Sequence, residues 1–428
     1  MNWRFGALWQ ARRDSMSEII FHIDVNSAYL SWTAVEQIKR GAQCDIRTVP
    51  SIIGGDQKSR HGVVLAKSIP AKRYGIHTGE PVVNALHKCP QLLMFPPDHK
   101  MYAIYSKNLM DFLKSYTPDL EQVSVDECYL DFTGIAHRFQ SPVAAAIEIK
   151  DCIYEQFGFT VNIGISSVKL LAKMASDFQK PNRVHTLFPE EIKEKMWPLP
   201  IRELYMAGKS SVDVLEKLEI RTIGELAQAD PELLQIHLKS HGKLLWEFAN
   251  GIDLTPVQTK RAEAKGIGNS TTLSKDILDG EEARKVLLSL SESVGNRLRQ
   301  AKQKAGMISV EIKYYDFRSV SHQKQLSRET NADTVIYQAA CELFEELWSK
   351  EPIRLLGVRT SKLADEGEPE QLSIFDIQYD KPEDEKHRKL DKALDEIRKR
   401  FGEQAVVRGT FLDSEMKKPN SGQKQSED

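Results

Sequence analysis

The chain has 428 residues, of which 41% are hydrophobic, 28% charged and 8% aromatic, the balance of a folded globular protein. This length predicts roughly two to four domains. No stretch approaches the ~18 uninterrupted apolar residues that a membrane span needs, so an integral membrane protein is excluded. Lysine and arginine number 59 against 61 aspartate and glutamate, so the overall charge does not single out a nucleic-acid-binding protein.

The five cysteines are scattered and form no CxxC pair. This argues against a disulfide framework and against a structural zinc site, and we expect a protein of the reducing cytoplasm. Residues 1–15 lack the long apolar core of a signal peptide, and a second methionine follows at Met16. We expect this stretch to be a disordered extension or to precede an alternative start.

The first half of the chain predicts an α/β order. Residues 18–25 alternate apolar and polar side chains and indicate a strand, and a helical pattern follows at 27–39. Residues 44–97 are rich in glycine and proline and indicate a small inserted subdomain. Helices are then predicted at 101–116, 142–157 and 168–178, with strands at 121–125, 128–132 and 160–165. Without the insertion the order is β-α-β-β-α-β, which is ferredoxin-like.

The second half predicts two further regions and a tail. Residues 199–256 indicate several short helices joined by tight turns. The next region alternates helices at 281–303 and 331–349 with strands at 307–315, 320–327 and 353–362. From residue 366 the chain is polar and net acidic, and we expect it to be mostly disordered, with one helical pattern at 389–401. The fold class is therefore α+β with several domains.

Three carboxylates stand out. Asp24 ends an otherwise apolar strand, and the adjacent pair Asp126 and Glu127 separates two short strands. A charge on a core strand is costly unless it is paired or binds a metal. Carboxylate oxygens suit Mg²⁺, and a pair of such ions stabilises the attacking and leaving oxygens of phosphoryl transfer. From the residues alone, a polar hairpin turn and a helix N-cap remain an equal alternative.

Five segments, in order, resemble the Y-family (DinB/UmuC-type) translesion DNA polymerases, and the resemblance covers roughly residues 17–365. The segments are FHIDVNSAYLS, LAKSIPAKRYGI, SVDECYLDFTG, VNIGISSVKLLAKMASDFQKPN and LWEFANGID. The resemblance implies a right-hand polymerase with a ferredoxin-like palm, small fingers, a helical thumb with helix-hairpin-helix elements and an α+β little finger. The implied domains are an extension (1–17), palm (18–27 and 98–187), fingers (28–97), thumb (188–256), linker (257–264), little finger (265–365) and tail (366–428).

The same resemblance implies roles for individual residues around the nucleotide. The catalytic, metal-binding triad is Asp24, Asp126 and Glu127, with the carbonyl of Val25 as a further ligand of two Mg²⁺ ions. Tyr29 matches the steric gate, an aromatic ring that leaves no room for a ribose 2′-OH. The implied nucleotide-binding residues are Ala28, Tyr29, Ser68, Lys72 and Lys180. Ile69 departs from the family pattern, because DinB-type members often carry a tyrosine there.

Contacts with DNA are implied for the thumb and the little finger. In the thumb they fall on Ala207, Gly208 and Lys209, where Met206 replaces the first glycine of the family's G-x-G turn. In the little finger, strand alternation puts part of a polar set on one sheet face, suited to a duplex backbone. That set is Lys313, Arg318, Ser319, His322, Lys324 and Arg359. A solvated sheet face would show the same pattern.

A short apolar string, QLSIF, interrupts the polar tail. Apolar residues in a disordered segment have little to bury against within the chain, which favours docking into another protein. The string resembles the sliding-clamp-binding motif of bacterial polymerases, with clamp contacts at Gln371, Leu372, Ile374 and Phe375.

The resemblance predicts a template-directed DNA polymerase of low fidelity that performs translesion synthesis, in which the primer 3′-OH attacks the α-phosphate of a dNTP. Its partners would be primer-template DNA, dNTP and a sliding clamp, and the protein would be a monomer without membrane contact. Two alternatives remain. One is a nucleotide cyclase on the same palm fold, and the other is a non-catalytic accessory protein that binds DNA and the clamp.

Overall fold

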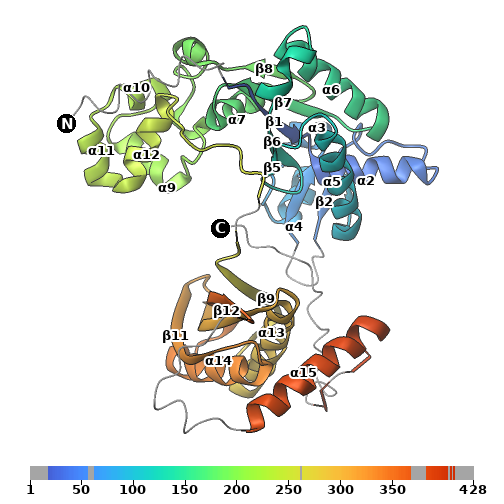
Figure 1. The fold of residues 1–428 in the computed structure, drawn as a ribbon, viewed down its shortest axis with the longest axis vertical. Coiled ribbons are helices and arrows are strands. Elements are labelled where there is room, and N and C mark those ends of the chain that lie inside the picture. Colours follow the sequence, from blue (N-terminus) through green and yellow to red (C-terminus); the bar gives the residue numbers. More distant parts are fainter. Residues whose placement is uncertain are drawn as a thin grey trace. The chain divides into compact units, whose positions relative to one another are not determined.

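The computed structural model describes residues 18–55, 62–260, 263–367, 382–402, 405–406 and 408–409. They divide into two compact units, the first holding residues 18–55 and 63–260 and the second holding the residues from 263 onward. Both units combine helices with sheets (Figure 1), so the predicted α+β multidomain class is confirmed. No helix among the described residues is both long and apolar enough to cross a membrane.

A five-stranded sheet with the order β5-β6-β1-β7-β8 is the centre of the first unit. The bounds of its strands are β5 Leu120–Gln122, β6 Glu127–Asp131, β1 Ile20–Val25, β7 Val161–Ser166 and β8 Val184–Thr186. β1 pairs antiparallel with both β6 and β7, as the ferredoxin-like order predicts. β8 was not predicted, because its three residues are too few to show alternation, and it extends the sheet parallel to β7.

The two faces of this sheet differ in chemistry. Phe21, Ile23 and Val25 of β1 point toward the apolar core formed with α2 (Ala28–Lys39), α5 (His99–Lys114) and α6 (Pro142–Phe157). Because side chains alternate along a strand, His22 and Asp24 point to the opposite face, which α7 (Lys169–Asp177) covers. The polar residues of β1 are therefore gathered beneath a single short helix.

α7 approaches the sheet very closely, because β7 carries Gly164 beneath it. A Cβ at Gly164 would lie 1.9 Å from the carbonyl oxygen of Ala172 and 2.5 Å from the amide nitrogen of Ser176. Only a residue without a side chain fits this contact. Asn162, also on this face of β7, donates from Nδ2 to the carbonyls of Ser176 at 3.0 Å and Gln179 at 2.7 Å, and so holds the end of the helix.

The remaining elements of the first unit form a small sheet and a helical bundle. The small sheet has the order β3-β2-β4, with a compact apolar cluster of its own. Its elements are β2 Ser51–Gly54, β3 Val64–Lys67, α3 Ile69–Arg73, α4 Val82–Lys88 and β4 Leu93–Phe95. The bundle packs on the outer side of α7. Its helices are α8 Ile192–Lys195, α9 Lys209–Lys217, α10 Ile223–Gln228, α11 Pro231–Leu238 and α12 Ser240–Ala249.

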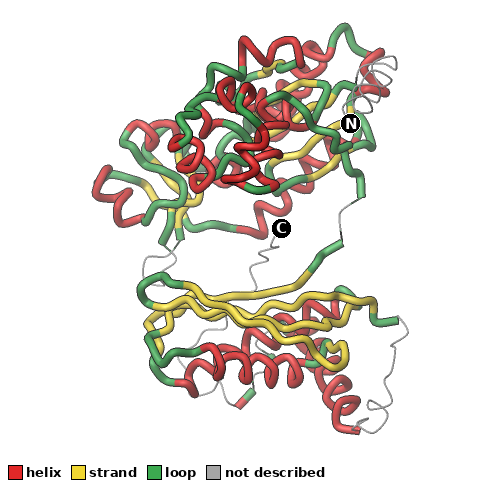
Figure 2. Tube along the Cα trace, turned by 90° about the vertical axis from the view of Figure 1, so that its left-hand side faces the viewer, coloured by secondary structure: helices red, strands yellow, loops and turns green. Residues whose placement is uncertain are grey.

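The second unit is a four-stranded antiparallel sheet with the order β11-β10-β12-β9. Its helices lie on one face of the sheet, as Figure 2 shows. Its elements are β9 Gly266–Ile277, α13 Gly280–Gln300, β10 Gln303–Tyr314, β11 Ser319–Thr330, α14 Asp333–Leu347 and β12 Ile353–Asp365. β9 was not predicted, because polar residues occupy many of its outward positions.

In the tail, the helical pattern predicted at 389–401 is confirmed as part of the helix α15 (Pro382–Phe401), and the prediction of disorder is wrong for residues 382–388. Its acidic side packs on the second unit around Arg299, a side chain that is 5% exposed. The Arg299 guanidinium bonds to Asp395 at 2.6 Å and to Asp333 of α14 at 2.8 Å, and Asp391 lies 3.7 Å away. The sequence pattern had pointed to the apolar stripe of this helix, but its charged side makes the contact.

Candidate active site

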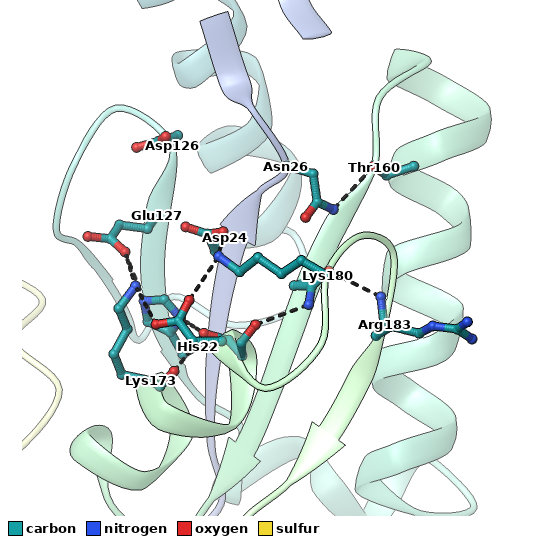
Figure 3. A network of polar contacts seen from close by, with 12 residues as sticks. His22, Asp24, Asn26, Asp126, Glu127, Thr160, Lys173, Lys180 and Arg183 are labelled. Carbon is teal, nitrogen blue, oxygen red and sulfur yellow. Dashed lines mark hydrogen bonds and ion pairs between the residues drawn. The ribbon is translucent and has the colours of Figure 1, made fainter. Parts of the chain in front are cut away.

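The register of β1 and β6 brings the predicted carboxylates together. Asp24 is directly opposite Glu127 in the antiparallel ladder, and both face α7. Asp126 precedes β6 in the turn, and its carbonyl accepts a hydrogen bond from the Val25 amide at 3.0 Å. Figure 3 shows the three carboxylates gathered at one end of the sheet, with Val25 next to Asp24 in the chain. Glu127 lies within β6, not in the turn that the sequence indicated.

Each of the three carboxylates is held through one oxygen. Oε2 of Glu127 accepts from Lys173 Nζ at 2.7 Å, and Nε2 of His22 lies 3.3 Å from the same oxygen. Lys180 Nζ bonds to Oδ2 of Asp24. Oδ1 of Asp126 accepts from the Ser124 hydroxyl at 2.6 Å. Within the described part of the chain, the other oxygen of each carboxylate has no bonded partner.

These contacts set the protonation of the acids. Burial by itself would raise the pKa of Glu127, but His22 and Lys173 outweigh it and lower that pKa to about 2. Burial raises the pKa of Asp126, and the nearby charges of Asp24 and Glu127 add to this effect against the hydrogen bond from Ser124. The cluster therefore holds more negative charge than its two lysines neutralise, a property that favours a bound cation.

The donor set fits a hard divalent cation. Among the described residues, no three His, Cys, Asp or Glu side chains already converge tightly enough to enclose an ion. The three acids nevertheless present three unbonded oxygens from adjacent backbone positions, and oxygen is the ligand that Mg²⁺ and Ca²⁺ prefer.

Lys180 follows α7 and reaches back to the sheet. Besides Asp24, it bonds to Oδ1 of Asp177 at 2.9 Å. Burial opposes its charge, but the two carboxylates outweigh burial and raise its pKa, so it is a cation at neutral pH. Lys180 is therefore a cation directly beside the acids.

Tyr29 lies in the first turn of α2, five residues after Asp24. Its ring stacks on Tyr102 with centroids 4.4 Å apart and planes 9° apart, and His99 meets it edge-on. Tyr102 is 1% exposed and its hydroxyl lies 3.0 Å from that of Thr33, so the stack has a rigid base. This support fixes the plane of Tyr29, as a steric gate would require.

The other predicted nucleotide residues have unequal surroundings. Ala28 is buried as the first residue of α2. The Ser68 hydroxyl donates to the Val49 carbonyl at 2.7 Å and accepts from the Ala71 and Ser51 amides at 3.1 Å, so it is already used in capping α3. Lys72 is exposed on α3. Burial, with the nearby charge of Lys72, lowers the pKa of Lys67.

The bundle keeps the predicted turn despite its lost glycine. Met206 has φ +69°, the left-handed conformation that glycine favours, and is half exposed. Ala207 and Gly208 follow, and Gly208 caps α9, which begins at Lys209. The first amides of α9 are therefore directed as a phosphate contact needs.

The strands of the second unit divide the predicted DNA set between two faces. Lys313 pairs with Ser319, and Arg359 pairs with Ser309 and Gly268, all with side chains on the face away from the helices. His322 and Lys324 lie opposite Val310 and Ile308, so they are on the helix face, and they contact Glu346 at 3.2 Å and Glu342 at 2.5 Å. Arg318, in the turn, bonds to Glu351 at 2.6 Å. Part of the set was predicted to share one face, and that part is Lys313, Ser319 and Arg359, whereas His322 and Lys324 lie on the other face.

Sequence reasoning missed the side chains that hold the acids. His22 alternates onto the same face as Asp24, two residues away, so the strand pattern contained this signal. Lys173 and Ser176 are one helical turn apart on α7, and that helix had a predicted place but no predicted orientation. The predicted clamp residues, Gln371, Leu372, Ile374 and Phe375, lie outside the described residues.

Comparison with known proteins identifies the family of the chain. Residues 23–177 match the impB/mucB/samB family model, and residues 264–374 match the model of that family's C-terminal domain. The chain is 50% identical over 402 residues to the DNA polymerase IV of Clostridium acetobutylicum, covering 94% of this chain and 100% of the relative. It is 34% identical over 404 residues to DNA polymerase IV 1 of Bacillus subtilis strain 168, with 94% and 95% covered.

A solved Y-family DNA polymerase chimera has the same fold, with a TM-score of 0.70 at 23% identity, covering 81% of this chain and 99% of the chimera. The resemblance seen in the sequence is confirmed by these matches. The chain therefore belongs to the Y-family of translesion DNA polymerases, in the DinB branch that includes DNA polymerase IV.

Proposed function

We propose that Asp24, Asp126 and Glu127 are the reaction centre of this polymerase and bind two Mg²⁺ ions. Polymerases of this family require divalent metal in general, and the chemistry joins the primer 3′-OH to the α-phosphate of a dNTP with release of pyrophosphate. The observation that supports the assignment is the register that places Asp24 opposite Glu127, with one unbonded oxygen on each acid. The carbonyl of Val25, at the end of β1, would add a ligand.

Bound there, a metal pair would activate the primer hydroxyl and neutralise charge on the triphosphate. Three side chains of the protein would have further roles at the nucleotide. Lys180 would move from Asp24 to the triphosphate, since both are anions within reach of one flexible cation. Lys72 would add a second positive charge. Tyr29, held by Tyr102, would exclude a ribose 2′-OH by contact with its ring.

DNA binding is proposed for two surfaces. The turn before α9, with Ala207, Gly208 and Lys209, would bind backbone phosphate through amides. The open sheet face with Lys313, Ser319 and Arg359 would lie along a duplex without reading its sequence. Binding of a sliding clamp through residues 371–375, a monomeric state and a cytoplasmic location are predictions that complete the proposal.

Primer extension with dNTPs and Mg²⁺ on an undamaged template tests the proposal. We expect short, template-directed extension by the wild type and its loss in Asp126→Ala/Glu127→Ala. Asp131→Asn is the matched control, because Asp131 lies at the far end of β6, where its carboxylate accepts from the Thr133 amide at 2.9 Å.

The alternatives give different results in the same assay. A nucleotide cyclase would form its product without a template. An accessory protein would bind primer-template but extend nothing, with or without a clamp, and its DNA binding would survive loss of the acids. Full extension by Asp126→Ala/Glu127→Ala would contradict the assignment of the reaction centre.

A further inference from the structure

Glu127 is held in an asymmetric way. Both of its neighbours, Lys173 at 2.7 Å and His22 at 3.3 Å, contact Oε2, and in the described residues nothing bonds to Oε1. A carboxylate on a flexible side chain loses several rotatable bonds when it binds a ligand, so a fixed orientation lowers the cost of binding. The contacts on Oε2 fix the group while leaving Oε1 available.

His22 is an unusual residue for its position. It is 1% exposed in the central strand. A buried imidazole is costly unless both of its nitrogens have partners. Here Nε2 faces Glu127, and Nδ1 lies 2.8 Å from the hydroxyl of Ser176.

The partners of His22 determine which nitrogen carries the proton. A carboxylate can only accept, so Nε2 must carry the hydrogen that faces Glu127. Nδ1 of the same ring lies 2.8 Å from the Ser176 hydroxyl, and that hydroxyl donates to the Lys173 carbonyl at 2.8 Å. Ser176 therefore acts on Glu127 through His22, without touching it.

One short helix supplies this support. Lys173 and Ser176 are three residues apart and lie on the same face of α7. Gly164 allows α7 to lie against β7, and Asn162 bonds to the carbonyl of Ser176 at 3.0 Å. The close approach of helix and sheet therefore brings both residues to β1 and β6 at once.

We propose that His22, Ser176 and Lys173 are positioning residues that hold Glu127 through Oε2 and direct Oε1 toward the metal. The inference rests on the proposed reaction centre and assigns its preorganisation to these three side chains. Their loss weakens metal binding, whereas the maximal rate at saturating metal is largely kept, because the ligand itself remains. A purely structural role would lower stability and leave the metal affinity of the folded protein unchanged.

Calorimetric titration with Mn²⁺ measures metal binding directly, on the full-length protein bound to a primer-template. The primer ends in a dideoxynucleotide, so that no extension takes place during the titration. We expect Ser176→Ala to bind Mn²⁺ roughly three- to tenfold more weakly, the effect of one buried hydrogen bond. Ser166→Ala is the matched control, because Ser166 is equally buried on β7 and donates only to the Leu187 carbonyl at 2.5 Å. It should stay within about twofold of wild type.

Extension assays give the second measurement. Ser176→Ala should raise the half-saturating Mg²⁺ concentration by a similar factor and change the maximal rate by less than about twofold. His22→Gln keeps an amide donor and should retain more metal affinity than His22→Leu. Thermal melting of each variant shows whether it is folded. If His22→Leu does not fold, Ser176→Ala still tests the proposal.

Asp126→Ala separates the two proposals. Lost Mn²⁺ binding in Asp126→Ala with wild-type binding in Ser176→Ala would overturn the positioning role and leave the reaction centre in place. Unchanged binding in both would overturn the reaction centre itself. Equal weakening in Ser176→Ala and Ser166→Ala would show that any lost buried hydroxyl has this effect, and would also refute the positioning role.

Discussion

Gly164→Ala is the substitution for which the structure makes the sharpest prediction. The new Cβ would lie 1.9 Å from the Ala172 carbonyl and 2.5 Å from the Ser176 amide, where real Cβ contacts stay above 3.0 Å. Both atoms belong to the backbone of α7, so no side chain can rotate away. The helix must therefore move by about 1.1 Å or more from β7.

The cost follows from the rigidity of this contact. Overpacking costs about 1–3 kcal/mol in general, and a clash with backbone on two sides belongs at the upper end. For a unit of this size, about 3 kcal/mol corresponds to a fall in melting temperature of roughly 6–12 °C. The movement of α7 also shifts Lys180, which follows the helix, away from Asp24, and a displacement of 1 Å at such a site costs about 10²-fold in rate.

Thermal unfolding and primer extension, the latter well below both melting temperatures, measure the two effects. Gly134→Ala is the matched control, because Gly134 is exposed and a Cβ there meets nothing within 4 Å. We expect the control to match wild type in both assays. A Gly164→Ala protein that melts within about 1 °C of wild type and extends primers normally would refute the argument.

Three further predictions concern other parts of the chain. Tyr29→Ala should raise ribonucleotide incorporation relative to deoxyribonucleotide by roughly 10²-fold, and an unchanged ratio in single-nucleotide extension would exclude a steric gate there. Arg299→Met leaves the acids of α15 without their buried partner, so trypsin should cleave residues 382–402 faster than in the wild type. The control Arg284→Met, at an exposed ion pair, should not have this effect. Equal cleavage rates in Arg299→Met and the wild type would contradict the packing of α15 around Arg299. Burial raises the pKa of Asp333 to about 7, so between about pH 4 and 7 the folded state keeps a proton that the unfolded chain has lost. The free energy of unfolding should therefore fall as pH rises through this window. In denaturant titrations, Asp333→Asn should remove this part of the pH dependence.

Much of the fold follows from local patterns in the sequence. The alternation in 18–25 and the helical periodicity of 142–157 predicted β1 and α6 nearly to the residue, because one apolar face of each is buried in a single core. β8 and β9 were missed, since one is very short and the other carries polar residues outward. The helix α15 was recognised by its apolar stripe, but its contact is made by Asp391 and Asp395.

The sequence by itself determined which acids come together. Asp24, Asp126 and Glu127 stand out because carboxylates are costly at the ends of apolar strands, and a strand order that can be predicted brings them to one edge. The segments that the family shares also led to the predicted roles of Tyr29 and Lys180, which stay predictions. These features depend on residue type and on neighbours along the chain.

Tertiary structure alone decided how those acids are held. Which oxygen of Glu127 is bonded, and that His22, Ser176 and Lys173 hold it, depends on the register of β1 with β6 and on the approach of α7 that Gly164 permits. The same holds for the face of each strand in the second unit, which separates Lys313 from Lys324. Contacts between residues distant in the chain are set by packing in three dimensions, and no pattern along the chain records them.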